Sequence, residues 1–138
     1  MEPVKEITVK ITVQAPVEKV WAYWTEPTHM TKWNFASDDW HSPFAENDLR
    51  EGGKFTSRME AKDGSFGFDF GGVYDEITLH KVIAYTMEDG RKAKITFNDR
   101  GNETEVIETF DAEGANSLEL QQQGWQAILN NFKRYVEL

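Results

Sequence analysis

The sequence contains no cysteine, which excludes disulfide bonds, thiolate metal sites and cysteine nucleophiles. It also has no apolar run of the roughly 18 residues that a membrane-spanning helix needs. The first residues lack the basic and apolar regions of a signal peptide. From these absences we expect a cytoplasmic protein that does not insert into a membrane.

Positive charge is scarce as well. The chain carries 15 Lys and Arg against 24 Asp and Glu, which gives a formal net charge of -9. So acidic a chain repels the phosphate backbones of DNA and RNA, and we therefore expect no nucleic-acid partner.

The common catalytic signatures are missing too. The sequence has no Gly-x-Ser-x-Gly elbow, no His-Glu-x-x-His helix and no phosphate-binding Gly-Lys-Ser/Thr loop. His29, Asp38, Asp39 and His41 offer metal-ligating side chains, but their spacing holds them on no common face of an element. We expect no metal site, no cofactor and no hydrolase, transferase or redox activity.

Aromatic residues, in contrast, are abundant: the 138 residues include five Trp and nine Phe. A chain of this length forms one domain of ordinary size, and no linker, repeat or low-complexity segment divides it. We expect a single domain over residues 1–138. Aromatic side chains in this number either fill a large core or line a pocket.

The N-terminal part predicts one strand followed by two short helices. From Val4 to Val13 apolar and polar residues alternate, as in a strand with one face in water. Pro16 suits the first turn of a helix, whose apolar residues recur at helical spacing until Pro27. Thr28 can cap a second short helix.

Residues 34 to 51 show no period and mix aromatic residues with turn formers. Irregular loops of this length are uncommon in compact domains unless they have a function. Trp40 and Phe44 are also poor choices for a loop that is merely solvated. We expect a packed flap over one end of the core, either a structural plug or a ligand lid.

From about Gly53 to Phe110 the chain predicts antiparallel strands joined by turns that carry Gly and Asp. The apolar positions change from even to odd after Gly71 and Gly72, and a bulge there is the simplest explanation. In the last of these strands Glu108 shares the inward face with its apolar neighbours. The last three strands are predicted at Val82–Glu88, Lys92–Asn98 and Glu103–Phe110.

A long amphipathic helix is predicted from Ser117 to Val136, with Asn116 or Ser117 as its N-cap. Its wide apolar stripe must be buried, and the sheet is the large surface that can cover it. We expect Trp125 and Phe132 to be among the most buried residues. The element order therefore predicts an α+β fold, with a curved antiparallel sheet around one long helix.

Two glutamines make the start of that helix polar on its buried side. Gln121 and Gln122 lie one turn before Trp125 on the same stripe. Buried polar groups need hydrogen-bond partners, which are either protein groups or a molecule held between helix and sheet.

Several short motifs, in this order and spacing, resemble one known superfamily. They are Val13-x-Ala15-Pro16-x-Glu18-x-Val20-Trp21, Pro27, Trp33, Asp48-Leu49-Arg50-x-Gly52-Gly53-x-Phe55, Met59-Glu60-x-x-Asp63-Gly64, Gly72-x-Tyr74-x-Glu76-Ile77 and Gly124-Trp125-x-x-Ile128-Leu129. This pattern, which runs from about residue 8 to residue 136, resembles the SRPBCC (START-related) superfamily. Within it, the chain is similar to the branch named after the activator of the ninety-kilodalton heat-shock chaperone's ATPase.

The resemblance implies a helix-grip fold, in which a curved antiparallel sheet wraps around the long C-terminal helix, with two short helices after the first strand. It also implies a cavity that, in many members, holds a hydrophobic small molecule. A chaperone is a second partner that it suggests. The co-chaperone that named the branch carries a further N-terminal domain, whereas only a few residues precede the first strand here, so we expect little stimulation of a chaperone ATPase.

The expected function is non-enzymatic binding of an aromatic or lipid-like molecule between sheet and helix, unless the aromatic residues fill that space themselves. Trp33, Trp40 and Phe44 are expected at the mouth, and Gln121 or Gln122 as polar contacts. The full set of candidate ligand-binding residues is Trp33, Trp40, Phe44, Ser57, Met59, Phe68, Phe70, Tyr74, Phe97, Glu108, Gln121, Gln122, Trp125 and Leu129.

Glu108 carries the enzymatic alternative. Some relatives in the superfamily are polyketide cyclases and aromatases, and a buried carboxyl with a raised pKa is suited to acid–base chemistry. Such work would involve Glu108 together with Tyr74 or His41. A lone inward carboxyl is more often bonded to a neighbouring side chain or to water, and we therefore expect binding without catalysis.

Overall fold

The computed structural model describes residues 5–138, so that Val4, the predicted start of the first strand, lies outside the described residues. One sheet and three helices make up this part of the chain. Their bounds are β1 Glu6–Val13, α1 Val17–Thr25, α2 Pro27–Trp33, β2 Trp40–Asn47, β3 Lys54–Ala61, β4 Gly67–Thr78, β5 Val82–Met87, β6 Lys92–Asp99, β7 Thr104–Asp111 and α3 Leu118–Val136.

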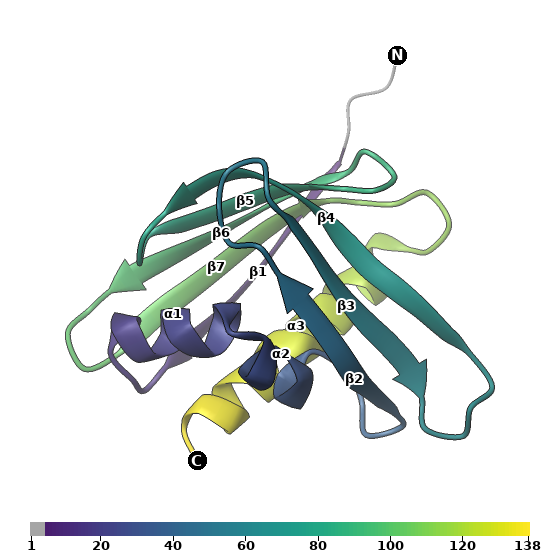
Figure 1. The fold of residues 1–138 in the computed structure, drawn as a ribbon, viewed down its shortest axis with the longest axis horizontal. Coiled ribbons are helices and arrows are strands. Elements are labelled where there is room, and N and C mark those ends of the chain that lie inside the picture. Colours follow the sequence, from purple (N-terminus) through teal and green to yellow (C-terminus); the bar gives the residue numbers. More distant parts are fainter. Residues whose placement is uncertain (1–4) are drawn as a thin grey trace.

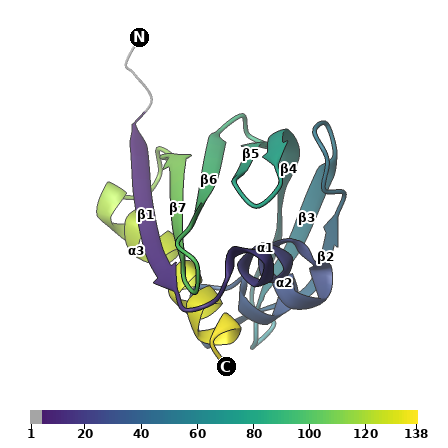
Figure 2. The same cartoon turned by 90° about the vertical axis from the view of Figure 1, so that its left-hand side faces the viewer.

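The seven strands form one antiparallel sheet in the order β1-β7-β6-β5-β4-β3-β2. The sheet curls around α3, while α1 and α2 lie across one end of the concave side (Figure 1, Figure 2). The predicted helix-grip architecture is therefore confirmed. Inward side chains of the strands and the buried stripe of α3 form one hydrophobic core.

Helix α3 begins and ends where its sequence favours helix termini. The Ser117 hydroxyl accepts a hydrogen bond from the Leu120 backbone N–H at 3.1 Å, which identifies Ser117 as the N-cap. Lys133 and Arg134 lie in the last turn, where positive charge stabilises the helix dipole. Phe132 is fully buried beneath this helix, as predicted.

The position of α3 across the sheet is asymmetric. The Gln126 side-chain amide donates to the Lys10 carbonyl at 3.1 Å, and Lys133 Nζ donates to the Thr12 carbonyl at 2.8 Å. Helix α3 thereby covers the free edge of β1. Its close backbone neighbours among the described residues are β1, α1 and α2, and the β3–β4 half of the concave face extends beyond it (Figure 2).

The prediction of an irregular loop over residues 34–51 was wrong, because this segment contains β2. Strand β2 lies at the other edge of the sheet and pairs only with β3. Its register shifts between His41 and Phe44, with Pro43 in between, and this irregularity removes the alternation by which strands are recognised. An edge strand with a proline also avoids pairing with other chains.

The predicted bulge exists, but it lies between Tyr74 and Glu76 rather than at Gly71 and Gly72. The glycines have another role, which is close approach of neighbouring strands. A Cβ atom on Gly72 would lie 2.3 Å from the carbonyl oxygen of Thr86. Such a contact is far inside van der Waals distance, so only glycine fits there.

The helix starts differ slightly from the predictions. Pro16 is the N-cap of α1 rather than a residue of its first turn, and Thr28 lies inside the first turn of α2. Helix α2 begins at Pro27, with Glu26 as its N-cap. Proline favours this first position because its missing N–H would have no helical partner there.

Candidate functional site

A cavity of about 340 Å³ lies between the concave face of the sheet and α3. Its wall includes residues from all three helices, from strands β3, β4, β5 and β7, and from the segments that join these elements. The lining residues are Trp24, Met30, Trp33, Asn34, Phe55, Ser57, Met59, Phe68, Phe70, Tyr74, Ile83, Tyr85, Arg91, Glu108, Glu113, Asn116, Gln121, Trp125 and Ile128.

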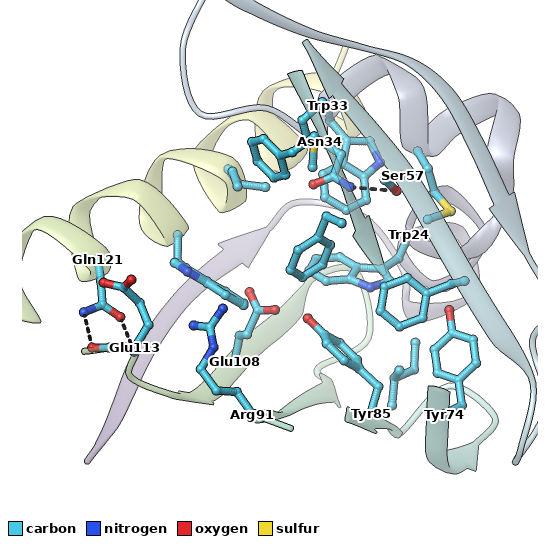
Figure 3. A pocket seen from close by; sticks show the side chains of 18 of the residues that line it. Trp24, Trp33, Asn34, Ser57, Tyr74, Tyr85, Arg91, Glu108, Glu113 and Gln121 are labelled. Atoms are coloured by element: carbon cyan, nitrogen blue, oxygen red, sulfur yellow. Dashed lines mark hydrogen bonds between the residues drawn. The ribbon is translucent and has the colours of Figure 1, made fainter. Parts of the chain in front are cut away.

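One end of the cavity is aromatic (Figure 3). Trp24 of α1 and Trp33 of α2 lie with ring centroids 4.8 Å apart, and both pack edge-on against Phe132. On the sheet side, the Phe55 ring lies 5.0 Å from that of Tyr74. Contacts of this kind keep large rings in fixed positions, so the wall is shaped before any ligand arrives.

Three side-chain hydrogen bonds hold this end of the cavity together. The Tyr74 hydroxyl donates to Asn47 Oδ1 at 2.5 Å, and Asn47 Nδ2 donates in turn to the Thr25 carbonyl at 2.6 Å. Asn34, after α2, donates to the Ser57 hydroxyl at 3.2 Å. Helix and sheet are thus joined by polar contacts within an apolar wall.

Further along the cavity Tyr85, Arg91 and Glu108 form what we name the polar wall (Figure 3). Glu108 is only 6% exposed, and burial raises its pKa to about 8. Burial and the neighbouring Glu108 carboxyl raise the pKa of Tyr85 well above its usual value. Arg91 Nε donates to Asp89 at 2.7 Å, beside the cavity.

The loop that leads into α3 closes the cavity next to the polar wall. Gln121 accepts a hydrogen bond from the Glu113 backbone N–H at 2.9 Å and donates to the Glu113 and Asn116 carbonyls. The amide of Gln121 is therefore occupied by backbone partners. It lines the cavity, but it fixes the loop instead of offering free polar groups to a ligand.

The opening lies where α3 leaves the β3–β4 half of the sheet uncovered. Of the lining residues, Phe68 is 43% exposed and Asn116 is also exposed, whereas Trp33 is buried at 3% exposure. The mouth is therefore at β4 and the loop before α3, and the prediction that Trp33 belongs to it was wrong. Trp33 is held deep in the structure because its indole N–H donates to the Tyr23 carbonyl at 2.9 Å.

Most of the predicted site residues meet at the cavity. Strand parity placed the sheet residues correctly on the inward face, and helical spacing did so for those of α3. The predicted residues that line the cavity are Trp33, Ser57, Met59, Phe68, Phe70, Tyr74, Glu108, Gln121 and Trp125.

The other predicted residues lie outside the lining. Phe97 packs under α1 against Trp21, with ring centroids 5.2 Å apart, and Leu129 is fully buried in the core. Gln122 is exposed because it lies on the flank of α3 that faces water. Trp40 and Phe44 belong to edge strand β2, where Phe44 is 50% exposed.

Trp125 differs from its prediction in burial. It is half-buried instead of being among the most buried residues, because it borders the cavity. Several lining residues were missed in the sequence. Parity along the strands would have found Phe55, Ile83 and Tyr85, whereas no local pattern marks Arg91, which enters from the β5–β6 turn.

Comparison with known proteins identifies the family. Residues 14–137 match the family described as Activator of Hsp90 ATPase homolog 1-like protein. The chain belongs to this family. Members of the family and its fold are associated with ligand binding or co-chaperone action in general. No protein with a curated description matches the chain.

Solved structures agree with this family membership. The AHSA1-like protein from Aeromonas hydrophila is 42% identical, with a TM-score of 0.90 over 96% of this chain and 92% of that protein. A protein from Cytophaga hutchinsonii is 57% identical, with a TM-score of 0.83 and the same shares covered. A Nitrosomonas europaea protein, at 20% identity and a TM-score of 0.81 over 96% of this chain and 94% of its own, shows the fold alone.

Two further properties of residues 5–138 concern membranes and metal ions. None of the helices there is both long and apolar enough to cross a membrane. In the same range, no group of three or more His, Asp or Glu side chains is arranged to hold a metal ion.

Proposed function

We propose that the protein reversibly binds a hydrophobic small molecule, aromatic or lipid-like, in the cavity between the sheet and α3. The observation that carries this proposal is the cavity itself, about 340 Å³ in volume and walled mainly by aromatic side chains and methionines. Pockets for small molecules measure about 300 to 1,000 Å³. The cavity is at the lower end of this range, which favours one compact ring system over a long lipid chain.

The energy of an empty cavity supports an occupant. Apolar space costs about 24 cal/mol per Å³, so 340 Å³ left empty would cost about 8 kcal/mol. This is comparable with the entire stability of a small domain, about 5 to 15 kcal/mol. Water or a ligand must therefore fill the space. Water is a poor partner for the aromatic end, where Trp24, Trp33 and Phe55 offer few hydrogen bonds, and an apolar ligand gains by displacing it.

A binding experiment with matched variants tests the proposal. Native mass spectrometry of freshly purified protein detects a retained ligand, and amide-shift titration with a panel of small aromatic compounds locates it. We expect shifts at Ile83, Trp125 and Ile128, which line the cavity. Ile128→Phe narrows the cavity and should weaken binding and these shifts, whereas Val73→Phe, on the outer face of β4, should not.

The results distinguish binding in the cavity from the absence of a binding site. Saturable shifts that Ile128→Phe weakens and Val73→Phe retains support binding in the cavity. If no compound of the panel shifts the lining residues and no mass is retained, the cavity is not a binding site and the proposal is wrong.

A protein partner is the second candidate, and a surface feature favours it. The exposed Phe66 and Phe68 form an aromatic cluster with the half-buried Trp40 beside the mouth, with ring centroids 5.9 to 6.1 Å apart. The family is named after an activator of the Hsp90 ATPase. This candidate requires that the protein change the ATPase rate of its own organism's chaperone. Phe66→Ser should then reduce the effect, and Leu79→Ser, equally exposed elsewhere, should not.

The enzymatic alternative depends on Glu108. A carboxyl whose pKa is about 8, facing a cavity, is suited to general acid–base catalysis. If a compound that binds in the cavity is also converted, Glu108→Gln should reduce turnover about a hundredfold or more with the fold intact. Turnover that survives this substitution would exclude Glu108 as the acid or base.

A further inference from the structure

Among the described residues, neither the Tyr85 hydroxyl nor the Glu108 carboxyl of the polar wall forms a side-chain hydrogen bond, and Arg91 pairs with Asp89 through Nε. Burial raises the pKa of Glu108, and burial together with the neighbouring Glu108 carboxyl raises the pKa of Tyr85. Both groups nevertheless line the cavity, and Figure 3 shows the Tyr85 hydroxyl and the Arg91 guanidinium directed towards the side of Glu108. Polar groups that are buried in this way need a partner, and the space in front of them belongs to the cavity.

The strand register explains why these side chains share one space. Tyr85 of β5 pairs with Ala93 of β6, and the adjacent inward residue of β6, Ile95, pairs with Glu108 of β7. Tyr85 and Glu108 therefore lie on either side of β6, offset by one inward position. Because Ala93 is small, the long Tyr85 side chain can extend over β6 towards the carboxyl. Arg91, two residues before Ala93, enters from the same side.

The protonation states make all three groups donors at neutral pH. Arg91 is always charged, and its Nε is the nitrogen that pairs with Asp89. The raised pKa of Tyr85 keeps its hydroxyl proton in place. The pKa of Glu108, about 8, leaves most of the carboxyl protonated near pH 7, so that its O–H also donates.

The remaining titratable groups at the cavity do not change this pattern. The Tyr74 hydroxyl donates a hydrogen bond to Asn47 Oδ1, and the Glu113 carboxylate accepts one from the Asn116 backbone N–H at 2.6 Å. Among the described residues that line the cavity there is no Lys or His. The polar wall is thus a set of donors at one side of a mainly apolar cavity.

We propose that the ligand is an apolar ring compound with one acceptor oxygen, a carbonyl or a carboxylate, which lies between Tyr85, Arg91 and Glu108. This inference rests on the proposed binding function and names the chemistry of its ligand. A ketone oxygen has two lone pairs and accepts two of the three donors, while a carboxylate accepts all three. An amine fits poorly, because its cation would lie beside Arg91 and would need an ionised Glu108 in a dry site.

The proposal predicts how affinity depends on pH. An acceptor oxygen binds the protonated form of Glu108, and this form is lost as the pH rises above about 8. The dissociation constant should be flat below this value and then rise by up to about tenfold per pH unit. An ammonium ligand would show the opposite dependence, since it pairs with the ionised carboxylate and binds more tightly as the pH rises.

Four probes with the same naphthalene ring test the ligand class: 2-ethylnaphthalene, 2-acetonaphthone, 2-naphthoate and 2-(aminomethyl)naphthalene. Dissociation constants are measured by amide-shift titration and calorimetry from about pH 6 to about pH 9. We expect the ketone or the carboxylate to bind about tenfold or more tightly than the hydrocarbon at neutral pH, as one charge-assisted or two ordinary hydrogen bonds provide. The amine should bind no more tightly than the hydrocarbon.

Variants of the polar wall assign the effect to its residues. Glu108→Gln keeps an N–H donor, so it should retain the preference for the oxygen probes and lose the change in affinity above about pH 8. Glu108→Leu and Tyr85→Phe should reduce that preference while the hydrocarbon still binds. Glu105→Gln, on the outward side of the same strand, should behave as the parent does.

The results test this inference separately from the proposed function. Equal affinity for the hydrocarbon and the oxygen probes, or tightest binding of the amine, contradicts the donor assignment while binding in the cavity stands. A preference that Glu108→Leu and Tyr85→Phe both leave unchanged also contradicts it. If none of the four probes binds, the proposed function fails together with the inference.

Discussion

Trp125 of α3 lies parallel to Phe110 of β7, with ring centroids 3.7 Å apart and ring planes 10° apart. Phe110 is buried at 1% exposure, whereas Trp125 borders the cavity and meets Phe70 edge-on. One face of the indole thus belongs to the core and one edge belongs to the cavity. The pair marks the boundary at which close packing ends and the space for a ligand begins.

Truncation on the two sides of this boundary should differ in cost. Phe132→Ala removes a fully buried ring between Trp24 and Trp33, and should lower the free energy of unfolding by about 3 to 5 kcal/mol. Trp125→Ala should cost less, about 2 to 3 kcal/mol, because one edge of its indole borders the cavity and not the packed core. Urea unfolding measures both. A larger loss for Trp125→Ala would show that the cavity is closed and packed in solution.

Glu108 should make the stability of the protein dependent on pH. Burial raises its pKa from an ordinary 4.5 to about 8, so between these values the folded protein holds a proton that the unfolded chain has lost. The free energy of unfolding should therefore fall as the pH rises through this window, by up to about 1.4 kcal/mol per pH unit. The loss should end near the upper pKa.

The substitution Glu108→Gln removes this titration. Its free energy of unfolding, measured by urea denaturation, should decline less than that of the parent across the same pH window, and should exceed the parent's at the upper end. Glu105→Gln, on the outward side of β7, is the control and should keep the parental slope. Parallel curves for the parent and Glu108→Gln would mean that Glu108 titrates normally.

Asn47 should contribute more to the stability of the fold than its position in an edge strand suggests. Its side chain joins Tyr74 of β4 to the Thr25 carbonyl at the end of α1. Tyr74→Phe loses one hydrogen bond, about 1 kcal/mol, whereas Asn47→Ala loses two and leaves the Tyr74 hydroxyl buried without a partner, about 2 to 3 kcal/mol. The double variant should cost less than the sum of the two. Strict additivity in chemical denaturation would speak against this relay.

Gly72 and Gly90 should respond to alanine for different reasons. A Cβ on Gly72 would meet backbone atoms of β5 at 2.3 Å, so the strands must separate, and we expect a loss of about 3 kcal/mol or more. Gly90 has open space around it but a φ of +91°, and its substitution should cost only about 1 to 2 kcal/mol. Thermal unfolding of the two variants compares these costs. If the two variants lose the same amount of stability, the assignment of Gly72 to close contact between strands is wrong.

The features that could be predicted from the sequence are those with a local physical cause. Alternation along β7 placed Glu108 on the inward face, because successive side chains of a strand point to opposite sides. The helical stripe of α3 placed Phe132 in the core for the corresponding reason, and Ser117, one of the two predicted N-caps, caps the helix. These properties depend on neighbours in the chain, which any reader of the sequence can see.

The features that were missed depend on pairing and on where α3 lies. Strand β2 pairs on one side only, so no complete alternation marks it, and Trp40 was assigned to a flap. Gln121 forms its hydrogen bonds with the loop before α3, and Arg91 reaches the cavity from a turn. The Gln121 contacts cross a loop to residues eight and five positions away, and Arg91 meets residues of distant elements, so neither follows a helical or strand period.

The three helices, the regular strands with their inward faces, and the family resemblance followed from the order of residues along the chain, because periodic burial and capping are local; strand β2 did not. The cavity did not. It exists because Gln126 and Lys133 hold α3 against the edge of β1, which leaves the β3–β4 half of the concave face uncovered. The number of aromatic residues was compatible with a filled core or a lined pocket, and the lateral position of one helix distinguishes the two.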